Sequence, residues 1–346
     1  MIVVAGSVVP TVQLGDGLTV SAMGFGGMAL TSMYGDTDTA QSRSTLGHCL
    51  DIGVTFIDTA DVYGGGDNER LIAEVLTTRR DEVIVATKFG ITANPADRAA
   101  GRPGARGDAA YVRQCIDASL SRLGTDVVDL YYMHRRDLTV PIEETVGAMA
   151  ELVGAGKVRH LGLSEVTAEE LRAAVAVHPI AAVQSEWSLW SRDVENHVVP
   201  AAAELGVGFV PYSPLGRGFL TGTVTGADLT AASDFRRMLP RFADGALEAN
   251  RAVVDVIRAV AAEVDATPAQ IALAWLRYRA DALGVRAVPI PGTRRAERVD
   301  ENVAALSVTL TEGQLAVLDG VVDLVEGDRF GDLTWVSAGR EASQPG

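Results

Sequence analysis

Residues 56–64 read FIDTADVYG. A short apolar run ends there on the carboxylate of Asp58, and Tyr63 follows five residues later in a glycine-rich turn. Two later apolar runs also end on an ionisable residue, Lys88 in one and His134 in the other. Ionisable side chains are seldom buried without a partner, so core packing explains such a set poorly. We therefore expect these four residues to form one proton-transfer site.

Short apolar runs recur along the chain, and amphipathic segments separate them. The candidate strands lie near residues 21–26, 54–58, 83–88, 127–134, 158–163, 181–186, 207–213 and 285–290. The candidate helices cover residues 39–51, 68–77, 109–123, 141–155, 167–177, 194–205, 247–265, 268–279, 295–306 and 311–325. Strict alternation of strands and helices predicts parallel strands joined by helical crossovers. Eight repeats fit an α/β fold of the closed (β/α)8 TIM-barrel type better than an open doubly wound sheet.

The two ends of the chain add smaller elements to this barrel. Residues 11–20 alternate in polarity around the glycines of a Gly15–Gly17 turn, which predicts an N-terminal β-hairpin. The last amphipathic segment predicts a C-terminal helix, and the tail from Ala338 to Gly346 is expected to be frayed. Asp38 is a plausible cap for the first helix, and Thr167 opens a capping box.

No linker, sequence repeat or low-complexity tract divides the chain. Residues 1–346 are therefore expected to form a single domain, with its core at about 11–325. Two loops, at 89–108 and 214–246, exceed the usual length of a strand-to-helix connection. Long loops of this kind are typical of lids, binding loops or disordered segments.

The composition limits the classes of partner. The net charge of −15 makes nonspecific binding to nucleic acid or to anionic membranes unfavourable. The two cysteines, Cys49 and Cys115, form no disulfide framework, which favours a reducing compartment. The N-terminus lacks the basic region of a signal peptide, and no apolar run approaches eighteen residues. We expect a cytoplasmic protein that acts on a small molecule and binds neither nucleic acid nor membrane.

The four strand-end residues suit one kind of chemistry. An unperturbed tyrosine has a pKa of about 10, too high for efficient proton exchange at neutral pH. A cation within hydrogen-bonding reach lowers that pKa, and Lys88 could supply it while Asp58 orients the ammonium group. His134 could donate or accept at the same oxygen. Each residue alone is more simply a cap, a packing residue, a solvated cation or a core histidine, and only their combination favours a general acid beside a polarised carbonyl.

Other enzyme classes lack their motifs in this sequence. No Gly-x-Gly-x-x-Gly opens a strand–helix turn, and no Gly-x4-Gly-Lys-Ser/Thr is present. The five histidines show no metal-ligand spacing, and no Gly-x-Ser-x-Gly nucleophile elbow appears. A Rossmann dehydrogenase, a P-loop NTPase, a histidine-ligated metalloenzyme and a serine hydrolase are therefore disfavoured.

The chain resembles the aldo-keto reductases over roughly residues 11–325. Similar segments occur in the family's order: DTADVYG at 58–64, ATK at 86–88, DLYYMHR at 129–135, GLSE at 162–165, VQSE at 183–186, PYSPLG at 211–216, IPGTR at 290–294 and Glu301-Asn302. The segments GFGGM at 24–28 and GDRF at 327–330 look closest to the perakine reductase-like and bacterial general aldo-keto reductase branch. The resemblance implies a (β/α)8 barrel that uses NADPH to reduce aldehydes and ketones without metal or flavin.

The resemblance also implies the roles of individual residues. Tyr63 is the general acid, supported by Asp58, Lys88 and His134. Ser164 and Gln184 hydrogen-bond the nicotinamide carboxamide, and Tyr212 stacks on its ring, while later residues meet the pyrophosphate, the 2′-phosphate and the adenine. The residues placed against NADPH or NADP+ are Gly27, Met28, Asp58, Ser164, Gln184, Tyr212, Ser213, Leu215, Gly216, Gly218, Thr293, Arg294, Arg298, Glu301 and Asn302.

Two positions depart from the family pattern. Glu165 stands where many members have Asn, which weakens one expected carboxamide contact, and Trp187 stands where this branch often has Tyr. Met28, Tyr34 and Trp187 are candidate walls of the substrate pocket.

Two other functions stay open. Channel-associated members of the superfamily bind the cofactor and act mainly as subunits of a partner, and a non-redox barrel enzyme such as an isomerase is a weaker alternative. The sequence leaves open the substrate, the reaction direction, the strictness of the NADPH preference and whether the protein is a monomer or homo-oligomer.

Overall fold

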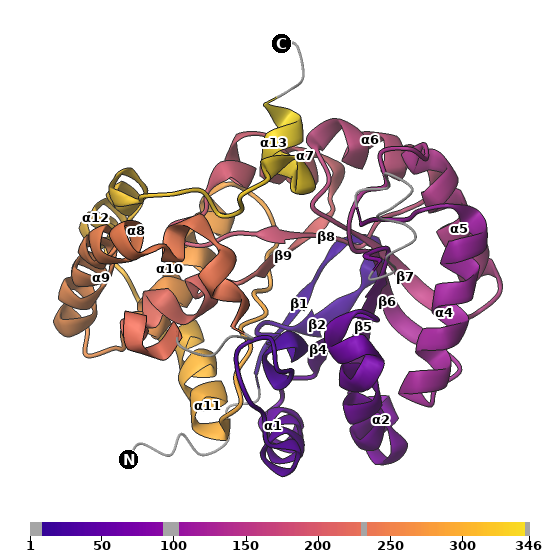
Figure 1. Cartoon of the computed structure of the whole chain (residues 1–346), viewed down its shortest axis with the longest axis horizontal. Coiled ribbons are helices and arrows are strands. Elements are labelled where there is room, and N and C mark those ends of the chain that lie inside the picture. Colours follow the sequence, from indigo (N-terminus) through magenta and orange to yellow (C-terminus); the bar gives the residue numbers. More distant parts are fainter. Residues whose placement is uncertain (1–8, 93–103, 230–233, 343–346) are drawn as a thin grey trace.

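The computed structural model describes residues 9–92, 104–229 and 234–342, and its centre is a parallel β-sheet (Figure 1). Consecutive strands lie side by side, each parallel to the next. The strands are β3 (Phe25–Gly26), β4 (Phe56–Asp58), β5 (Ile84–Phe89), β6 (Val128–Met133), β7 (Val158–Ser164), β8 (Ala182–Glu186) and β9 (Gly208–Tyr212). All their carboxyl ends therefore meet at one rim.

The eighth predicted strand, at 285–290, lies between β9 and β3 as an irregular segment. On one side the amide of Val288 donates to the carbonyl of Phe209 at 2.9 Å, and on the other the amide of Gly24 donates to the carbonyl of Pro289 at 3.0 Å. Pro289 and Pro291 face β3 and have no N–H to give, so the ladder on that side is incomplete, whereas Ile290 also donates to β9 at the carbonyl of Pro211. The segment nevertheless closes the ring, and the prediction of a (β/α)8 barrel is confirmed.

The predicted N-terminal hairpin is also present. Strands β1 (Thr11–Gln13) and β2 (Thr19–Ser21) are antiparallel, and their turn bonds to the start of β8 through the amide of Gly15 and the carbonyl of Ala181 at 2.8 Å. The apolar side chains of this hairpin pack against residues inside the barrel, namely Leu14, Leu18 and Val20 against Phe56, Leu130 and Val210. The hairpin thus covers the amino-terminal mouth, which leaves the opposite rim for a site.

Helices surround the strands in Figure 1. Their bounds are α1 (Thr39–Asp51), α2 (Asp67–Arg79), α4 (Ala109–Leu123), α5 (Ile142–Gly154), α6 (Ala168–Val177), α7 (Val198–Leu205), α8 (Asp244–Ala249), α9 (Arg251–Glu263), α10 (Pro268–Ala282), α11 (Ala296–Ala304), α12 (Glu312–Asp319) and α13 (Ser337–Glu341). The predicted caps are confirmed: Asp38 accepts the amides of Ala40 and Gln41, and Thr167 forms its capping box with Glu170. No helix within the described ranges is long and apolar enough to cross a membrane.

Two helix predictions near the C-terminal half need correction. The single helix predicted at 247–265 is divided into α8 and α9 at Asn250, whose side-chain amide donates to the carbonyls of Arg241 and Glu326. The helix predicted at 311–325 ends at Asp319 and continues as a 3-10 helix over Gly320–Leu324. In both places contacts or geometry beyond the local pattern decide the boundary.

The expectation of a frayed tail was wrong for its first part. Residues 337–341 form α13, and residues 343–346 lie outside the described ranges. In the first long loop, Thr92 and Arg106 form backbone hydrogen bonds with Gly104 and Gly90, while 93–103 are not described. Except at 230–233, which are also not described, the second long loop consists largely of short helical turns: Gly216–Thr221, Gly226–Leu229, Phe235–Met238, Pro240–Phe242 and the start of α8.

Candidate active site

The structure brings together the four residues predicted to form one site. Asp58 ends β4, Lys88 lies near the end of β5, His134 follows β6, and Tyr63 starts the 3-10 helix Tyr63–Gly66. The rings of Tyr63 and His134 meet edge to face with centroids 5.8 Å apart. The ammonium of Lys88 lies 5.1 Å from the centroid of the Tyr63 ring. The converging strand ends place Asp58, Lys88 and His134 on one rim, and the turn after β4 brings Tyr63 to it.

Lys88 and Asp58 form a buried ion pair, with Asp58 in the cavity wall and Lys88 behind it. The ammonium donates to Asp58 Oδ1 at 2.5 Å and to the carbonyl of Thr59 at 2.7 Å. Gln184 Nε2 donates to the second carboxylate oxygen at 2.9 Å. Burial raises the pKa of Asp58 and lowers the pKa of Lys88, and the attraction between the two charges opposes both shifts. The ammonium is therefore fixed in position by two oxygens.

A tight turn presents Tyr63 to the cavity. Gly64, Gly65 and Gly66 all have positive φ, which glycine adopts at little cost. Behind the turn, the Asn68 side chain accepts from the Thr59 hydroxyl at 2.6 Å and donates to the carbonyl of Gly27 at 2.9 Å. These two hydrogen bonds of Asn68 connect the start of α2, directly after the turn, to the rim of the barrel.

The electrostatics of Tyr63 differ from the sequence expectation. Burial raises its pKa well above the ordinary value, the Asp58 carboxylate raises it further, and the guanidinium of Arg135 lowers it. Lys88 was expected to be the cation that lowers it, but within the described residues no hydrogen bond joins Lys88 to the Tyr63 hydroxyl. Burial also lowers the pKa of His134, helped by Lys88 and Arg135. At neutral pH the phenol therefore holds its proton while the imidazole is neutral.

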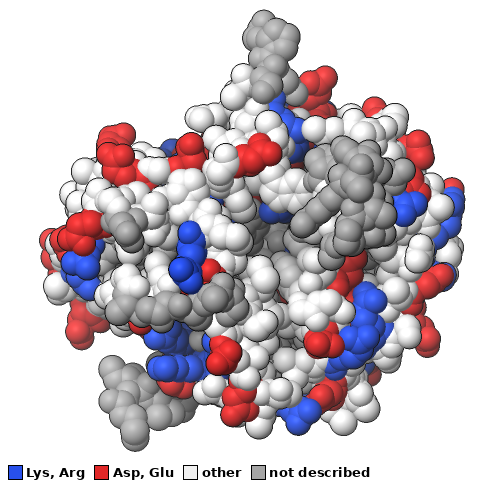
Figure 2. Space-filling view, viewed as in Figure 1, with Lys and Arg blue, Asp and Glu red and all other residues white. Residues whose placement is uncertain are grey.

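A cavity of about 620 Å³ opens at this rim and extends to the start of α11. This is the usual volume of a small-molecule site. The predicted residues in its wall are Met28, Asp58, Tyr63, His134, Ser164, Gln184, Tyr212, Ser213, Leu215, Gly218, Thr293, Arg294, Arg298, Glu301 and Asn302. Figure 2 shows the surface around this end of the barrel, with acidic and basic side chains spread over it.

Three predicted residues lie just behind the wall. Lys88 lies behind Asp58, its ion-pair partner, which lines the cavity. A Cβ atom on Gly27 would lie 2.7 Å from the carbonyl of Asp58, and one on Gly216 would lie 2.7 Å from the Trp190 ring. These two glycines permit close packing and do not line the cavity.

The segment after β9 has an unusual backbone. Ser213, Gly216, Arg217 and Gly218 all have positive φ. The amides of Gly216 and Gly218 are used within the turn, where they donate to the carbonyls of Ser213 and Leu215. The contact of this segment with the pyrophosphate of a dinucleotide, which the resemblance implies, stays a prediction.

The start of α11 offers N–H groups that suit an anion, with Arg295 and Arg298 exposed beside it in the cavity wall. Arg294 is already engaged, because its guanidinium donates to four carbonyls in the segment 29–36. The predicted contact of Arg294 with a phosphate stays a prediction, and one of its five N–H groups remains for it.

Sequence reasoning missed three arginines of the cavity wall. Arg217 and Arg236 lie in the second long loop and pair with Glu186 at 2.8 Å and Asp234 at 2.5 Å. Arg135 follows His134 directly. The signal for Arg135 was present, since a second ionisable residue extends the same apolar run.

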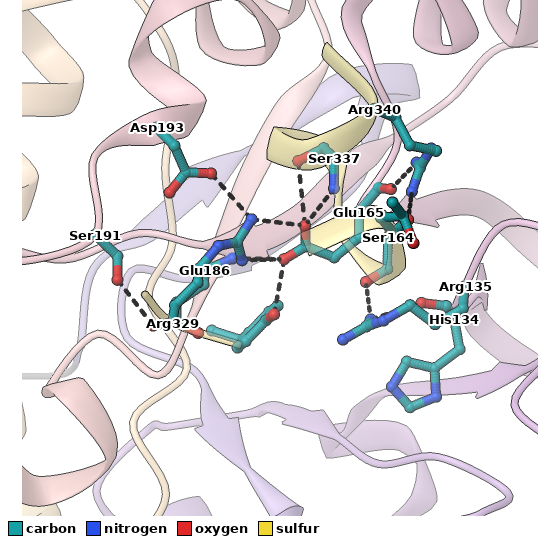
Figure 3. Close-up of polar contacts among 12 residues, drawn as sticks. His134, Arg135, Ser164, Glu165, Glu186, Ser191, Asp193, Arg329, Ser337 and Arg340 are labelled. Carbon is teal, nitrogen blue, oxygen red and sulfur yellow. Dashed lines mark hydrogen bonds and ion pairs between the residues drawn. The ribbon is translucent and has the colours of Figure 1, made fainter. Parts of the chain in front are cut away.

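Glu165, the first departure from the family pattern, is engaged away from the cavity. It is fully buried, and its carboxylate accepts two bonds from Arg329 at 2.7 and 3.0 Å. The Ser337 amide and hydroxyl each donate to the same carboxylate at 3.1 Å (Figure 3). The Tyr212 hydroxyl donates to it at 2.7 Å. Glu165 therefore fixes the ring of Tyr212 and holds the C-terminal segment, which explains why that tail is not frayed.

Replacing Glu165 with Gln is expected to lower the free energy of unfolding by about 3–5 kcal/mol at pH 7, because the substitution breaks a buried ion pair. Burial alone would raise the pKa of Glu165, but Arg329 outweighs it and holds this pKa well below its usual range. The pair therefore stabilises the wild type fully above the unfolded pKa of about 4.3, and this contribution is lost as the pH falls below it.

Unfolding midpoints measured from pH 7 to pH 3 would test this. We expect the wild type to lose more stability than Glu165→Gln over that range. Glu204→Gln is the control, since Glu204 pairs with Arg172 at the surface. Parallel curves for the wild type and Glu165→Gln would contradict the assignment.

Trp187, the second departure, does not line the cavity, so its prediction as a pocket wall was wrong. Its indole N–H donates to Glu195 at 2.9 Å, and its ring packs edge to face on Phe209. Met28 and Tyr34, the other predicted walls, do line it. Among the described residues, no group of His, Cys, Asp and Glu is arranged to hold a metal ion.

Comparisons with known proteins agree with this geometry. The thermostable aldo-keto reductase Tm1743, solved with the inhibitor epalrestat, is 27% identical, with a TM-score of 0.69 over 90% of this chain and 99% of that one. AKR11C1 from Bacillus halodurans, in its holo form, is 26% identical, with a TM-score of 0.71 over 94% and 99%. The glycerol dehydrogenase AKR11B4 from Gluconobacter oxydans shares the fold at 24% identity, with a TM-score of 0.78 over 90% and 94%. The model of the aldo/keto reductase family matches residues 22–323, and the chain therefore belongs to this family.

Proposed function

We propose that this oxidoreductase uses NADPH to reduce an aldehyde or ketone to an alcohol, with the proton supplied by Tyr63. One observation supports the proposal most directly: the phenol of Tyr63, the imidazole of His134 and the ammonium of Lys88 meet at one end of the cavity. The other end of the same cavity has a helix start and arginines that suit phosphates. Hydride transfer to a carbonyl requires a proton donor beside the oxygen and a dinucleotide beside the carbon.

Each residue of the site has a distinct task in this reaction. The bound nicotinamide would supply the hydride. Tyr63 donates its proton to the carbonyl oxygen, and the nearby ammonium of Lys88 stabilises the phenolate that remains. His134 orients the carbonyl by hydrogen bonding. Asp58 keeps Lys88 in place.

The cavity wall also supports binding of the cofactor. Ser164 and Gln184 present side chains that can bind a carboxamide, and Tyr212 has a ring held firmly enough to stack on nicotinamide. Six arginines and only two acidic residues line the cavity within the described part of the chain, although the whole chain carries a net charge of −15. This local excess of positive charge favours NADPH, which has one phosphate more than NADH.

Cofactor choice is expected to depend on Arg298 in particular. Arg298→Ala should lower the affinity for NADPH about 10- to 100-fold, as expected for the loss of charge-assisted bonds to a phosphate. The affinity for NADH should stay nearly unchanged. Arg294→Ala should lower the affinity for both NADPH and NADH, because it releases the segment 29–36 that forms part of the cavity wall. Dissociation constants from quenching of tryptophan fluorescence would check this. Equal losses of both cofactors in Arg298→Ala would remove it from the phosphate site.

The proposed activity is tested by absorbance at 340 nm with NADPH and a broad panel of aldehydes and ketones. Oxidation of NADPH that depends on the carbonyl compound is the expected result. Tight binding of NADPH without turnover would instead indicate a cofactor-binding subunit. Failure to bind any nicotinamide cofactor would point to a non-redox barrel enzyme.

A further inference from the structure

Arg135 has a buried guanidinium with unused donors. The residue is 7% exposed and lies in the cavity wall beside His134 (Figure 3). Its Nη1 donates to the carbonyl of His134 at 2.8 Å and to the Ser164 hydroxyl at 3.3 Å. Among the described residues, Nε has no hydrogen-bond partner and Nη2 makes no bond. Nε is enclosed, so the part of the guanidinium that remains available to a ligand is Nη2.

Other deeply buried arginines are paired with carboxylates. Arg329, at 4% exposed, binds Glu165 and Asp193. Further arginines whose side chains are at most 12% exposed also have acidic partners, namely Arg136, Arg192, Arg217, Arg236 and Arg340. A buried charge without a counter-ion is costly. Of the two arginines that are least exposed in the described chain, Arg329 has acidic partners and Arg135 has none, and Arg135 lies in the site.

Within the described residues, neighbouring groups hold Arg135 without forming an ion pair with it, although its charge acts on Glu165 through space. Its guanidinium carbon lies 6.0 Å from the ring centroid of Tyr212 and 5.8 Å from that of Trp335, so two aromatic faces stabilise the cation. The Glu165 carboxylate is engaged by Arg329, and the Asp58 carboxylate by Lys88. Neither acid has an ion pair with Arg135.

The cofactor does not supply the missing anion in the arrangement proposed above. Its phosphates would lie on the segment after β9 and at the start of α11, while Arg135 lies at the catalytic end beside His134 and Ser164. The nicotinamide at that end carries no negative charge. Within the described residues no carboxylate forms an ion pair with Arg135, which leaves the substrate as a source of the counter-ion.

We propose that Arg135 binds a carboxylate of the substrate, so that this reductase prefers carbonyl compounds that bear a carboxylate near the reacting C=O. This inference rests on the proposed function and names its substrate class. The overall reaction is oxo acid, NADPH and a proton giving hydroxy acid and NADP+, with the carboxylate unchanged. The planar fork of arginine suits a carboxylate, and burial strengthens the bond.

Matched pairs of substrates test the preference. Succinic semialdehyde is compared with its methyl ester, and 4-carboxybenzaldehyde with methyl 4-formylbenzoate, so that two spacings are sampled. In the wild type, kcat/KM should be about 10- to 100-fold higher for at least one acid than for its ester, as a hydrogen bond to a charged group implies. Equal values for acid and ester in both pairs would overturn the proposal.

Variants of Arg135 separate recognition from a structural role. Arg135→Gln should lose the preference mainly through KM of the acid, with KM of the ester and NADPH affinity nearly unchanged, and Arg135→Lys should restore part of it. Arg298→Ala is the control: it should lower the affinity for NADPH but leave the ratio of kcat/KM for acid and ester unchanged. If Arg135→Gln lowers activity equally with acid and ester, or weakens NADPH to the same degree, Arg135 is a positioning or cofactor residue and the proposal is wrong.

A binding measurement keeps the test independent of turnover. Calorimetric titration with glutarate in the presence of NADP+ should show binding to the wild type and none to Arg135→Gln. If no carbonyl compound is reduced but glutarate binds in this way, the proposed function fails while the carboxylate site stands. If esters are reduced but glutarate does not bind, the reductase stands and the carboxylate site is overturned.

Discussion

Replacing Tyr63 with phenylalanine is expected to lower kcat for carbonyl reduction by about 10²- to 10⁴-fold, the usual contribution of a positioned general acid. The phenol is the group that holds a proton at neutral pH beside His134, because burial and Asp58 both raise its pKa. The neutral imidazole of His134 is a poorer acid in this surrounding, since burial lowers its pKa. Loss of the hydroxyl therefore removes the proton and leaves the rest of the site in place.

NADPH affinity should stay near the wild-type value in Tyr63→Phe, because the ring still packs edge to face on His134. Single-turnover decay of absorbance at 340 nm measures the chemical step, and fluorescence quenching measures the dissociation constant. Tyr131→Phe is the matched control: its buried hydroxyl has no hydrogen-bond partner in the described chain, and its ring stacks on Phe89 outside the cavity. Turnover in Tyr63→Phe within tenfold of the wild type would remove Tyr63 from the acid role.

Local patterns predicted most of the fold correctly. The caps at Asp38 and Thr167 and the bounds of α1 and α4 depend on side chains within four residues, so one sequence contains the information. The barrel was predicted from the repeated alternation of strand and helix. The segment at 285–290 was recognised from its apolar pattern, although its prolines keep it from being a regular strand.

Errors arose where distant contacts decide the local structure. Asn250 divides a helix through bonds to residues up to 76 positions away. The C-terminal segment is ordered by Glu165, which is 164 positions from Arg329. Apolar periodicity contains no record of such pairs, so the tail was expected to fray. Ion pairs between residues so far apart in the sequence can be identified only from the structure.

In the candidate site, too, the positions of residues could be predicted from local pattern, whereas their contacts could not. Asp58, Tyr63, Lys88 and His134 were placed on one rim because strand ends in a parallel barrel converge. Sequence could not show that Asp58 and the carbonyl of Thr59 hold the Lys88 ammonium, so the action of Lys88 on the pKa of Tyr63 stays a prediction. Arg294 was given a phosphate role that its four carbonyl bonds now limit.

Replacing Lys88 with methionine is expected to have the second largest effect, and it acts on both stability and rate. The substitution leaves the Asp58 carboxylate buried with one remaining side-chain donor, Gln184. Removing one partner of a buried pair lowers the free energy of unfolding by about 3–5 kcal/mol. The loss of a cation 5.1 Å from the Tyr63 ring should also slow reduction about 10- to 1,000-fold, because the phenolate formed on proton transfer is less stable.

A second substitution separates these two effects. In the double variant Asp58→Asn/Lys88→Met both charges are gone, so no unpaired carboxylate is left, and uncharged replacements of a buried pair are often near neutral for stability. We expect thermal and urea unfolding to show most of the lost stability regained, while kcat stays low because the ammonium is still absent. Recovery of both stability and kcat would mean that Lys88 only neutralises Asp58. Recovery of stability alone would assign the ammonium a part in the proton transfer from Tyr63.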